Sequence, residues 1–147
     1  MGYAIEASSV IAAPVEDVWR VLVDLDGYAD WNRFTPRVRS GLAVGDPVEL
    51  EVVLGPRRRN RSVNHVERVE PPTTIVWSST LVGPTFLRTR RTQRVVDLGG
   101  GRVRYSTQEV FEGLLAPLVR LVSARAVRAG FEAVADGLRE HVEASRG

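Results

Sequence analysis

Apolar and polar residues alternate with a period of two over much of this chain, a pattern typical of strands with one buried face. The clearest stretch is 48–54, where Val, Leu, Val and Leu alternate with Glu, Glu and Val. Similar segments, several of them rich in β-branched residues, cover residues 3–12, 59–69, 74–82, 86–98 and 102–111. Turn residues separate the later segments, at Gly55-Pro56, Pro71-Pro72, Gly83-Pro84 and Gly99-Gly100-Gly101. The pattern therefore predicts a series of antiparallel strands joined by hairpins.

Apolar residues recur at helical spacing in other segments. Pro14 begins the first helix, with Glu16 and Asp17 near the positive end of its dipole. A second short helix is predicted over residues 27–31, with Asp26 as its N-cap. The third helix covers residues 115–143, and its apolar stripe consists of Leu118, Val122, Ala126, Val127, Phe131, Val134, Leu138 and Val142. At roughly 40 Å it needs a large apolar partner, which the concave face of the sheet supplies, so we predict an α+β fold.

Four segments, in this order, resemble the START-related SRPBCC superfamily, also called the helix-grip or pollen-allergen-like fold. They are residues 11–19 (IAAPVEDVW), 28–32 (YADWN), 66–77 with VERVEPP and IVW, and 111–115 (FEGLL). The chain looks particularly similar to the bacterial polyketide cyclase/dehydrase branch. The resemblance implies one domain over residues 1–147, in which a curved antiparallel sheet wraps around the long C-terminal helix. It implies no single function, because the superfamily includes lipid carriers, hormone receptors and aromatases.

The composition excludes several kinds of chemistry. The 147 residues include no cysteine, which excludes disulfides, thiolate metal sites and a cysteine nucleophile. All twenty basic residues are arginine, so no lysine Schiff base can form. His65 and His141 are far apart in the sequence and lack a nearby carboxylate cluster, so we expect no metal ion and no cofactor.

Charge and hydropathy narrow the range of partners. No apolar run is long enough to span a membrane, and the N-terminus lacks the pattern of a signal peptide, so we expect a cytoplasmic protein without membrane insertion. The densest charge run is Arg57-Arg58-Arg59-Asn60-Arg61. We interpret it as a solvated hairpin; the alternative is contact with nucleic acid or anionic lipid. No aromatic residues interleave with it to stack on bases, so we expect no nucleic-acid partner. The expected oligomeric state is a monomer or a homodimer.

Hairpin geometry predicts which side chains meet on one face of the sheet. A turn centred on Gly100 places three pairs opposite each other: Val95 with Tyr105, Gln93 with Thr107, and Arg91 with Glu109. A turn at Gly83-Pro84 places Leu81 opposite Leu87, Ser79 near Thr89, and Trp77 near Arg91. Continuing across Pro71-Pro72 brings His65 near Ser79 and Glu67 near Trp77, on the same face as Val63. This face is the more apolar and is predicted to point inward, although one bulge within residues 59–69 would turn His65 and Glu67 outward.

The inward face combines aromatic walls with polar groups, which suits a water-containing ligand cavity better than a plain core. The predicted ligand-binding residues are Trp31, Trp77, Ser79, Phe86, Gln93, Tyr105, Thr107, Phe111 and Phe131. The candidate catalytic residues are Arg91, Glu109 and His65. Arg91 would bind a carboxylate, enolate or phenolate while Glu109 orients it or moves a proton; alternatively the two form a cross-strand ion pair. His65 is either a general base or an exposed strand histidine, and Trp31 and Trp77 also suit simple core packing.

Three functions fit these residues. The first is binding of a hydrophobic, cyclic or aromatic small molecule between the sheet and the long helix, where Gly130 either permits close packing or leaves room for the ligand. The second, implied by the resemblance, is a polyketide aromatase/cyclase. In it Arg91 stabilises the enolate oxygen, Glu109 or His65 is the base, and Tyr105 or Ser79 orients a carbonyl. The third is a non-catalytic accessory protein that contacts a partner through its arginine-rich surface.

Overall fold

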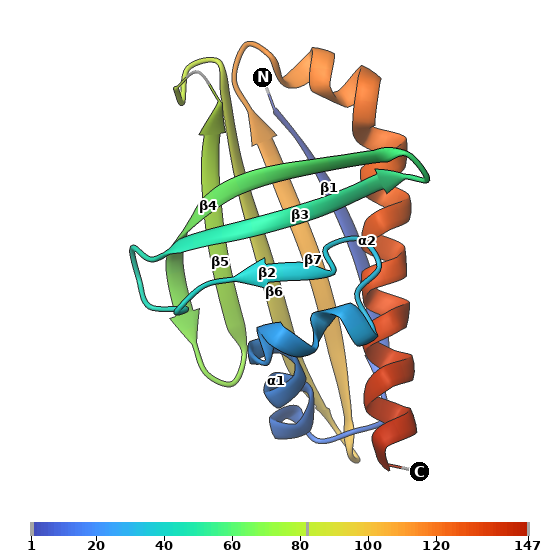
Figure 1. The fold of residues 1–147 in the computed structure, drawn as a ribbon. Helices are drawn as coiled ribbons and strands as arrows, with labels where there is room; N and C mark the ends of the chain where they lie inside the picture. The colour runs from blue at the N-terminus through green and yellow to red at the C-terminus, as the bar shows by residue number, and fades with distance from the viewer. Residues whose placement is uncertain (1, 82, 147) are drawn as a thin grey trace.

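A seven-stranded antiparallel sheet bends around one long helix in the part of the chain that the computed structural model describes, residues 2–81 and 83–146 (Figure 1). The strands are β1 (Gly2–Ile11), β2 (Arg37–Arg39), β3 (Pro47–Gly55), β4 (Arg58–Glu70), β5 (Thr74–Leu81), β6 (Leu87–Gly99) and β7 (Arg102–Glu112). Their order across the sheet is β1-β7-β6-β5-β4-β3-β2. The predicted α+β helix-grip arrangement is confirmed. Val82, which ends the strand predicted over 74–82, and residues 1 and 147 of the predicted domain lie outside the described residues.

The described residues also form α1 (Val15–Val23), the short 3₁₀ helix η1 (Leu25–Asp30) and α2 (Ala116–Arg146). α1 and η1 follow β1 as predicted and cover one end of the bent sheet, whereas α2 runs along it against β1, β7 and β3 (Figure 1). η1 begins at Leu25, so Asp26 lies inside its first turn and not at the predicted N-cap. The N-cap is Asp24, whose side chain makes no capping hydrogen bond. No helix of the described residues is long and apolar enough to cross a membrane.

The two hairpins that contain β6 have the register that their turns predict. Across β6 and β7, Arg91 is opposite Glu109, and across β5 and β6 the same Arg91 is opposite Trp77. The remaining predicted pairs on these strands are also present: Gln93 with Thr107, Val95 with Tyr105, Ser79 with Thr89, and Leu81 with Leu87. All three glycines of the β6–β7 turn have positive φ, a conformation that residues with a Cβ rarely adopt.

The predicted register is wrong along β4. Its pairing with β5 contains a bulge at Glu67, so Val66 lies opposite Trp77. Because side chains alternate between the two faces, one extra residue reverses the face of every residue before it. His65 and Val63 are consequently exposed on the outer face, and Glu67 is exposed beside them.

The core lies between the inner face of the sheet and the second part of α2. The buried residues of α2 are Ala116, Val127, Phe131, Val134, Ala135, Leu138 and Val142. The predicted stripe is therefore largely buried from Val127 onward, whereas Leu118 and Val122 are 57% and 59% exposed. Leu118 and Val122 are exposed because the first turns of α2 lie across one end of the sheet, before the helix runs down along its inner face (Figure 1).

Candidate functional site

A row of side chains crosses the inner face of the sheet, each from a different strand. Trp77, Arg91 and Glu109 are opposite one another on β5, β6 and β7, and Ile5 of β1 is opposite Glu109. α2 faces this row with Phe131, which is fully buried. Regular pairing of the strands on both sides of β6 thus brings residues from distant parts of the sequence into one layer.

Arg91 is the charged centre of this layer and is only 4% exposed. Its Nε donates a hydrogen bond to Thr107 Oγ1 at 3.1 Å. The guanidinium carbon lies 4.7 Å from the ring centroid of Phe131 and 5.9 Å from that of Trp77, so aromatic faces flank the charge. No carboxylate of residues 2–81 and 83–146 forms an ion pair with Arg91. The alternative of a direct Arg91–Glu109 ion pair is therefore wrong, although the two residues are opposite in register.

Glu109 lies beside the arginine and is half-buried. Burial raises the pKa of its carboxyl above the ordinary value, and the positive charge of Arg91 opposes this shift. Desolvation disfavours the charged form of a carboxyl, whereas a nearby cation favours it. The carboxyl group therefore holds a proton more readily than an exposed glutamate does.

A second group of buried polar side chains, formed by Tyr105 and Gln93, lies farther along β6 and β7 on the same face of the sheet. Tyr105 donates a hydrogen bond from its hydroxyl to Gln93 Oε1 at 2.5 Å. Burial raises the pKa of the Tyr105 phenol to about 12, with opposition from the nearby Arg91 charge, so the phenol is protonated at neutral pH. Tyr28 of η1 is also buried and donates to the carbonyl oxygen of Leu22 at 2.6 Å. Burial raises its pKa as well.

Two indole N–H groups in the interior have no acceptor. The Nε1 atoms of Trp31 and Trp77 are buried and make no hydrogen bond to the described residues. A buried donor without an acceptor costs about 1–3 kcal/mol. Trp77 is the neighbour of Arg91 across the β5–β6 pair. A buried donor that makes no hydrogen bond to the described residues therefore lies on the strand beside Arg91.

The segment between η1 and β2 packs tightly onto α2. A Cβ atom on Gly130 would lie 2.1 Å from the ring of Phe34, and one on Gly137 would lie 2.3 Å from the carbonyl oxygen of Trp31. The ring of Phe34 meets that of Phe131 edge-on at 5.6 Å. Of the two interpretations of Gly130, the structure therefore supports close packing, with Phe34 in the space that a side chain would take.

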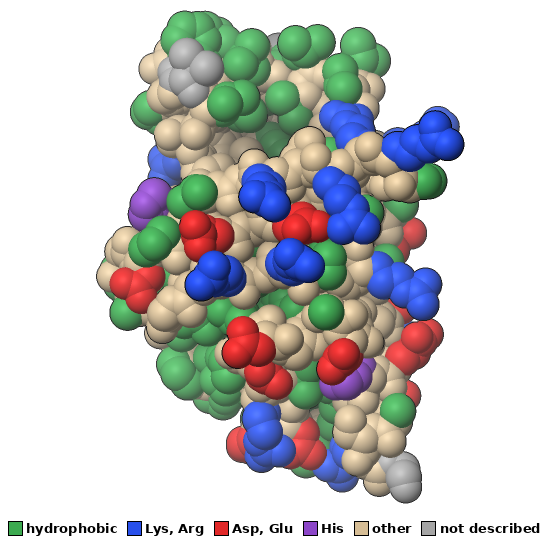
Figure 2. All heavy atoms as spheres, in the orientation of Figure 1, with side chains coloured by type: hydrophobic (Ala, Val, Ile, Leu, Met, Phe, Trp, Pro, Cys, Tyr) green, Lys and Arg blue, Asp and Glu red, His purple; other side chains and the backbone are tan. Residues whose placement is uncertain are grey.

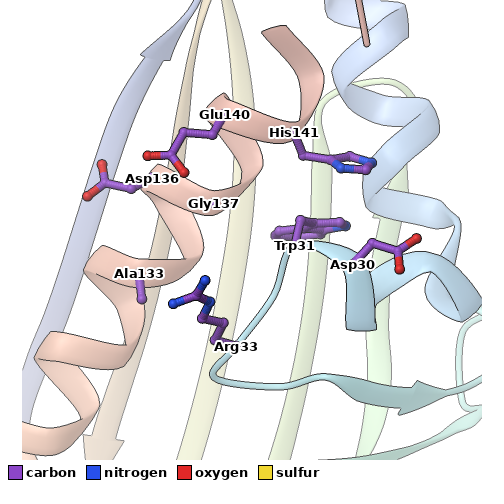
Figure 3. A pocket seen from close by; sticks show the side chains of 8 residues that line it. All are labelled: Asp30, Trp31, Arg33, Ala133, Asp136, Gly137, Glu140 and His141. Atoms are coloured by element: carbon purple, nitrogen blue, oxygen red, sulfur yellow. The ribbon is translucent and has the colours of Figure 1, made fainter. Parts of the chain in front are cut away.

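A surface hollow of about 430 Å³ lies beside this contact. It is lined by Asp30, Trp31, Arg33, Ala133, Asp136, Gly137, Glu140 and His141. Figure 3 shows the Trp31 ring at the centre of the hollow, below His141 and beside Asp30. On its other side Trp31 packs edge-on against Tyr28, with the ring centroids 4.8 Å apart. Trp31 therefore separates this hollow from the buried tyrosine behind it.

Other predicted site residues lie at different places. Phe86 is 42% exposed in the turn between β5 and β6, so it is not part of an inner wall. His65 is exposed on the outer face because of the β4 bulge, far from the base position predicted for it. Ser79 is half-buried and shares a 2.9 Å hydrogen bond with Thr89. Phe111 is buried and stacks on Tyr3 of β1 with the centroids 4.7 Å apart.

Tyr3, Tyr28 and Phe34 were not predicted as site residues from the sequence. Tyr28 precedes Trp31 by three residues, a spacing that places both on one side of a helix and could have identified it. Tyr3 lies on the inner face because β1 pairs with β7, and no hairpin predicts this pairing between the first and the last strand of the chain. Phe34 lies in the segment between η1 and β2, where no period marks an inward position. Within the described residues, no cluster of three or more His, Cys, Asp or Glu side chains is placed to hold a metal ion.

A bent antiparallel sheet that encloses a long C-terminal helix, with polar groups buried between them, defines a helix-grip protein. The chain belongs to the family described as polyketide cyclase/dehydrase and lipid transport, whose family model matches residues 3–143. The resemblance to the SRPBCC superfamily is thereby confirmed. Among curated proteins, no sequence matches this chain.

Solved structures share the fold at low sequence identity. The Zhui aromatase/cyclase of a Streptomyces species has a TM-score of 0.81 and 20% identity, covering 100% of this chain and 97% of that one. A Thermus thermophilus protein has a TM-score of 0.75 and 20% identity, covering 99% and 100%. Norcoclaurine synthase from Thalictrum flavum, in complex with dopamine and hydroxybenzaldehyde, has a TM-score of 0.69 and 16% identity, covering 97% and 87%.

Proposed function

We propose that the protein binds a hydrophobic, cyclic or aromatic small molecule between the inner face of the sheet and α2, with an oxygen atom of the ligand facing Arg91. The observation that carries this proposal is the guanidinium itself, which is buried between aromatic rings and forms no ion pair with a carboxylate of the described residues. A buried charge without an ion pair is unfavourable in a plain core. The hydrogen bond to Thr107 and the nearby Glu109 carboxyl, whose protonated form is favoured by burial, compensate the Arg91 charge only in part. A ligand that brings its own anionic or carbonyl oxygen would compensate the charge.

The groups around Arg91 define the chemistry of that ligand. The indole N–H of Trp77 is a second donor without an acceptor, on the strand beside Arg91. A carboxylate, enolate or phenolate oxygen would satisfy both donors. The flat rings of Trp77 and Phe131 favour an aromatic or cyclic body next to that oxygen. The family description, which covers cyclases and lipid transport, supports the same class of ligand.

The test compares an aromatic acid with a neutral analogue of the same shape. Binding of naphthoate and of naphthalenemethanol is measured by quenching of tryptophan fluorescence and by calorimetry. We expect the wild-type protein to prefer naphthoate by about tenfold or more, the contribution of a charge-assisted hydrogen bond. Arg91→Met should abolish this preference while retaining the apolar contacts. Arg104→Met, on the exposed outer face of β7, is the matched control and should keep the preference. Equal affinity of the wild-type protein for both compounds, or binding of neither, would contradict the proposal.

A second candidate function, polyketide aromatase/cyclase, is favoured by Glu109. Its half-buried carboxyl has a raised pKa and lies beside the arginine, which is the placement that a general base needs. In this reaction Glu109 would remove a proton from a methylene carbon between two carbonyl groups. Arg91 would stabilise the enolate oxygen, and the enolate carbon would attack a second carbonyl, so that the new carbon–carbon bond closes the ring. The protonated Glu109 would return its proton to the alkoxide formed at that carbonyl. Loss of this hydroxyl together with a proton from the neighbouring carbon, as water, would then give the double bond. Tyr105 or Ser79 would orient a carbonyl, whereas His65 no longer has a role.

The two functions are distinguished by the glutamate. The protein is supplied with the product of a minimal polyketide synthase, and the distribution of cyclised products is measured by mass spectrometry. We expect Glu109→Gln to lose cyclisation while keeping the preference for naphthoate, Arg91→Met to lose both cyclisation and this preference, and His65→Ala to lose neither. Unchanged products with and without the wild-type protein would leave binding as the function.

A further inference from the structure

One end of the molecule exposes a group of large apolar side chains, all of them aliphatic except one phenylalanine. They come from the end of β5, the turn between β5 and β6, the segment before α2, and the first turns of α2. Leu121 is 83% exposed. We call this surface the apolar end and define it by Leu81, Phe86, Leu114, Leu118, Leu121 and Val122. Figure 2 shows hydrophobic side chains gathered at this end, at the top of the view. Large exposed apolar patches of this kind mark surfaces that contact a partner or a membrane.

Hydrogen bonds hold the two parts of the apolar end together. The backbone N–H of Leu114 donates to the carbonyl oxygen of Thr85 at 3.1 Å, and that of Leu115 donates to the carbonyl oxygen of Phe86 at 2.8 Å. Gly113, at φ +113°, allows this close approach because a Cβ atom there would lie 2.5 Å from the same Phe86 oxygen. The hairpin turn and the start of α2 therefore form one continuous surface, with the leucines held outward.

The charge around the apolar end has a single sign. Residues 56–66, 80–88 and 113–131 contain no aspartate or glutamate, but they contain Arg57, Arg58, Arg59, Arg61, Arg88, Arg120, Arg125 and Arg128. Two of these arginines, Arg59 and Arg88, form ion pairs with Glu51 and Glu67. The other six form none with the described residues. Acidic residues directly border two of these ranges: Glu67 follows residue 66, and Glu112 and Glu132 lie on either side of 113–131. Glu112 is opposite Arg88 in the sheet.

We propose that the apolar end docks onto the surface of an anionic lipid bilayer. Leu118 and Leu121 would enter the boundary between head groups and acyl chains, while the surrounding arginines contact lipid phosphates. Exposed aliphatic residues on helical turns beside basic residues are the combination that interfacial binding requires. This proposal is independent of the ligand-binding function.

Charge complementarity decides between a bilayer and a second copy of the chain. A two-fold dimer through the apolar end would bring the same unpaired arginines of both copies together, which is electrostatically unfavourable. An anionic bilayer compensates those charges instead. It also adapts to side chains that protrude, as those of Leu118 and Leu121 do. The aliphatic character and the single sign of charge therefore favour lipid.

Co-sedimentation with phosphatidylcholine vesicles, with and without phosphatidylglycerol, tests the proposal. We expect the wild-type protein to partition onto the anionic vesicles, with partitioning falling as salt is added. The variant with Leu118→Ser and Leu121→Ser should lose about tenfold or more in partition coefficient, because two apolar side chains no longer leave water. Arg125→Gln should lose about fivefold, which corresponds to about 1 kcal/mol for one basic residue near an anionic surface.

The matched control variants change residues that are also exposed but lie outside the apolar end. Val44→Ser with Val96→Ser, and separately Arg104→Gln, should leave partitioning unchanged, because these exposed residues lie outside the apolar end. All substituted side chains are exposed, so thermal unfolding should stay close to that of the wild-type protein. The proposal fails if the wild-type protein does not bind anionic vesicles, or if the double leucine variant binds them equally well. It also fails if ultracentrifugation shows that the leucine substitutions convert a dimer to a monomer, since a second copy would then cover this end.

Discussion

Arg90 and Arg91 are neighbours on β6, yet their side chains lie in opposite environments. Arg90 is on the outer face, with its side chain 46% exposed, and its Nε donates a 2.8 Å hydrogen bond to Glu67. Arg91 is on the inner face, buried against Trp77 and Phe131 without an ion pair to the described residues. The alternation of side chains along a strand is the only reason that two identical residues differ so strongly.

Arg90 and Arg91 therefore affect the stability of the folded protein in different ways, although they are the same type of residue. An exposed ion pair such as Arg90–Glu67 contributes little to stability, since water screens it. A buried guanidinium is destabilising unless something compensates it, so its retention in the interior points to a ligand. The outer face of the sheet thus carries solvated charges, whereas the inner face carries the buried groups on which the proposed ligand binding rests.

The largest expected effect contrasts the two faces of β5. Trp77→Ala should lower the free energy of unfolding by about 3–5 kcal/mol, because a large buried side chain leaves a cavity beside Arg91. Thr80→Ala, at an exposed position of the same strand, should cost less than about 1 kcal/mol. Urea unfolding followed by circular dichroism measures both. Similar losses for the two variants would show that the inner layer is not tightly packed.

The next contrast exchanges each arginine for methionine. Arg91→Met should raise the free energy of unfolding of the ligand-free protein by about 1 kcal/mol or more, because an unpaired buried charge is removed. Arg90→Met should lower it by less than about 1 kcal/mol, because only an exposed ion pair is lost. A loss of stability in Arg91→Met as large as that in Trp77→Ala would mean that the guanidinium is structural.

The two faces should also differ in their response to pH. Burial raises the folded-state pKa of Glu109, so its stabilising contribution is full below the ordinary pKa of 4.5 and is lost as pH rises through the folded-state value. The hydrogen bond from Arg90 lowers the pKa of Glu67, so its contribution is present above the ordinary value and is lost as pH falls through the folded-state pKa. Urea unfolding over a pH series should therefore change in opposite senses in Glu109→Gln and Glu67→Gln. Parallel profiles for the two variants would contradict this assignment.

The smallest effect is expected at His65. It is exposed on the outer face, so His65→Ala should change the free energy of unfolding by no more than about 0.5 kcal/mol. Naphthoate affinity, measured as described above, should also stay the same. A marked loss of naphthoate affinity would show that the outer face of β4 takes part in binding, and that the two faces of the sheet do not differ as described.

Local pattern was sufficient for much of the fold and for part of the site. Glycine-rich turns and a period of two placed Trp77, Arg91 and Glu109 in one row, and the structure has that row. The same reasoning failed at His65, because a bulge leaves no mark in the alternation of β4. It also failed at Leu118, whose helical spacing matches that of buried residues such as Phe131 although no sheet lies beneath it.

The sequence by itself determined the order of the long strands and the helices, the turns between the later strands, and the inward position of Arg91, since all of these follow from contacts between residues close in the chain. It did not predict the short strand β2. Only the tertiary structure decided that Arg91 and Glu109 form no ion pair, that Phe34 fills the space over Gly130, and that the first turns of α2 remain uncovered. These features depend on how β1, the segment after η1 and α2 pack together. Such long-range packing depends on the shapes of the side chains and on the distances between the elements, which a local pattern of residues does not predict.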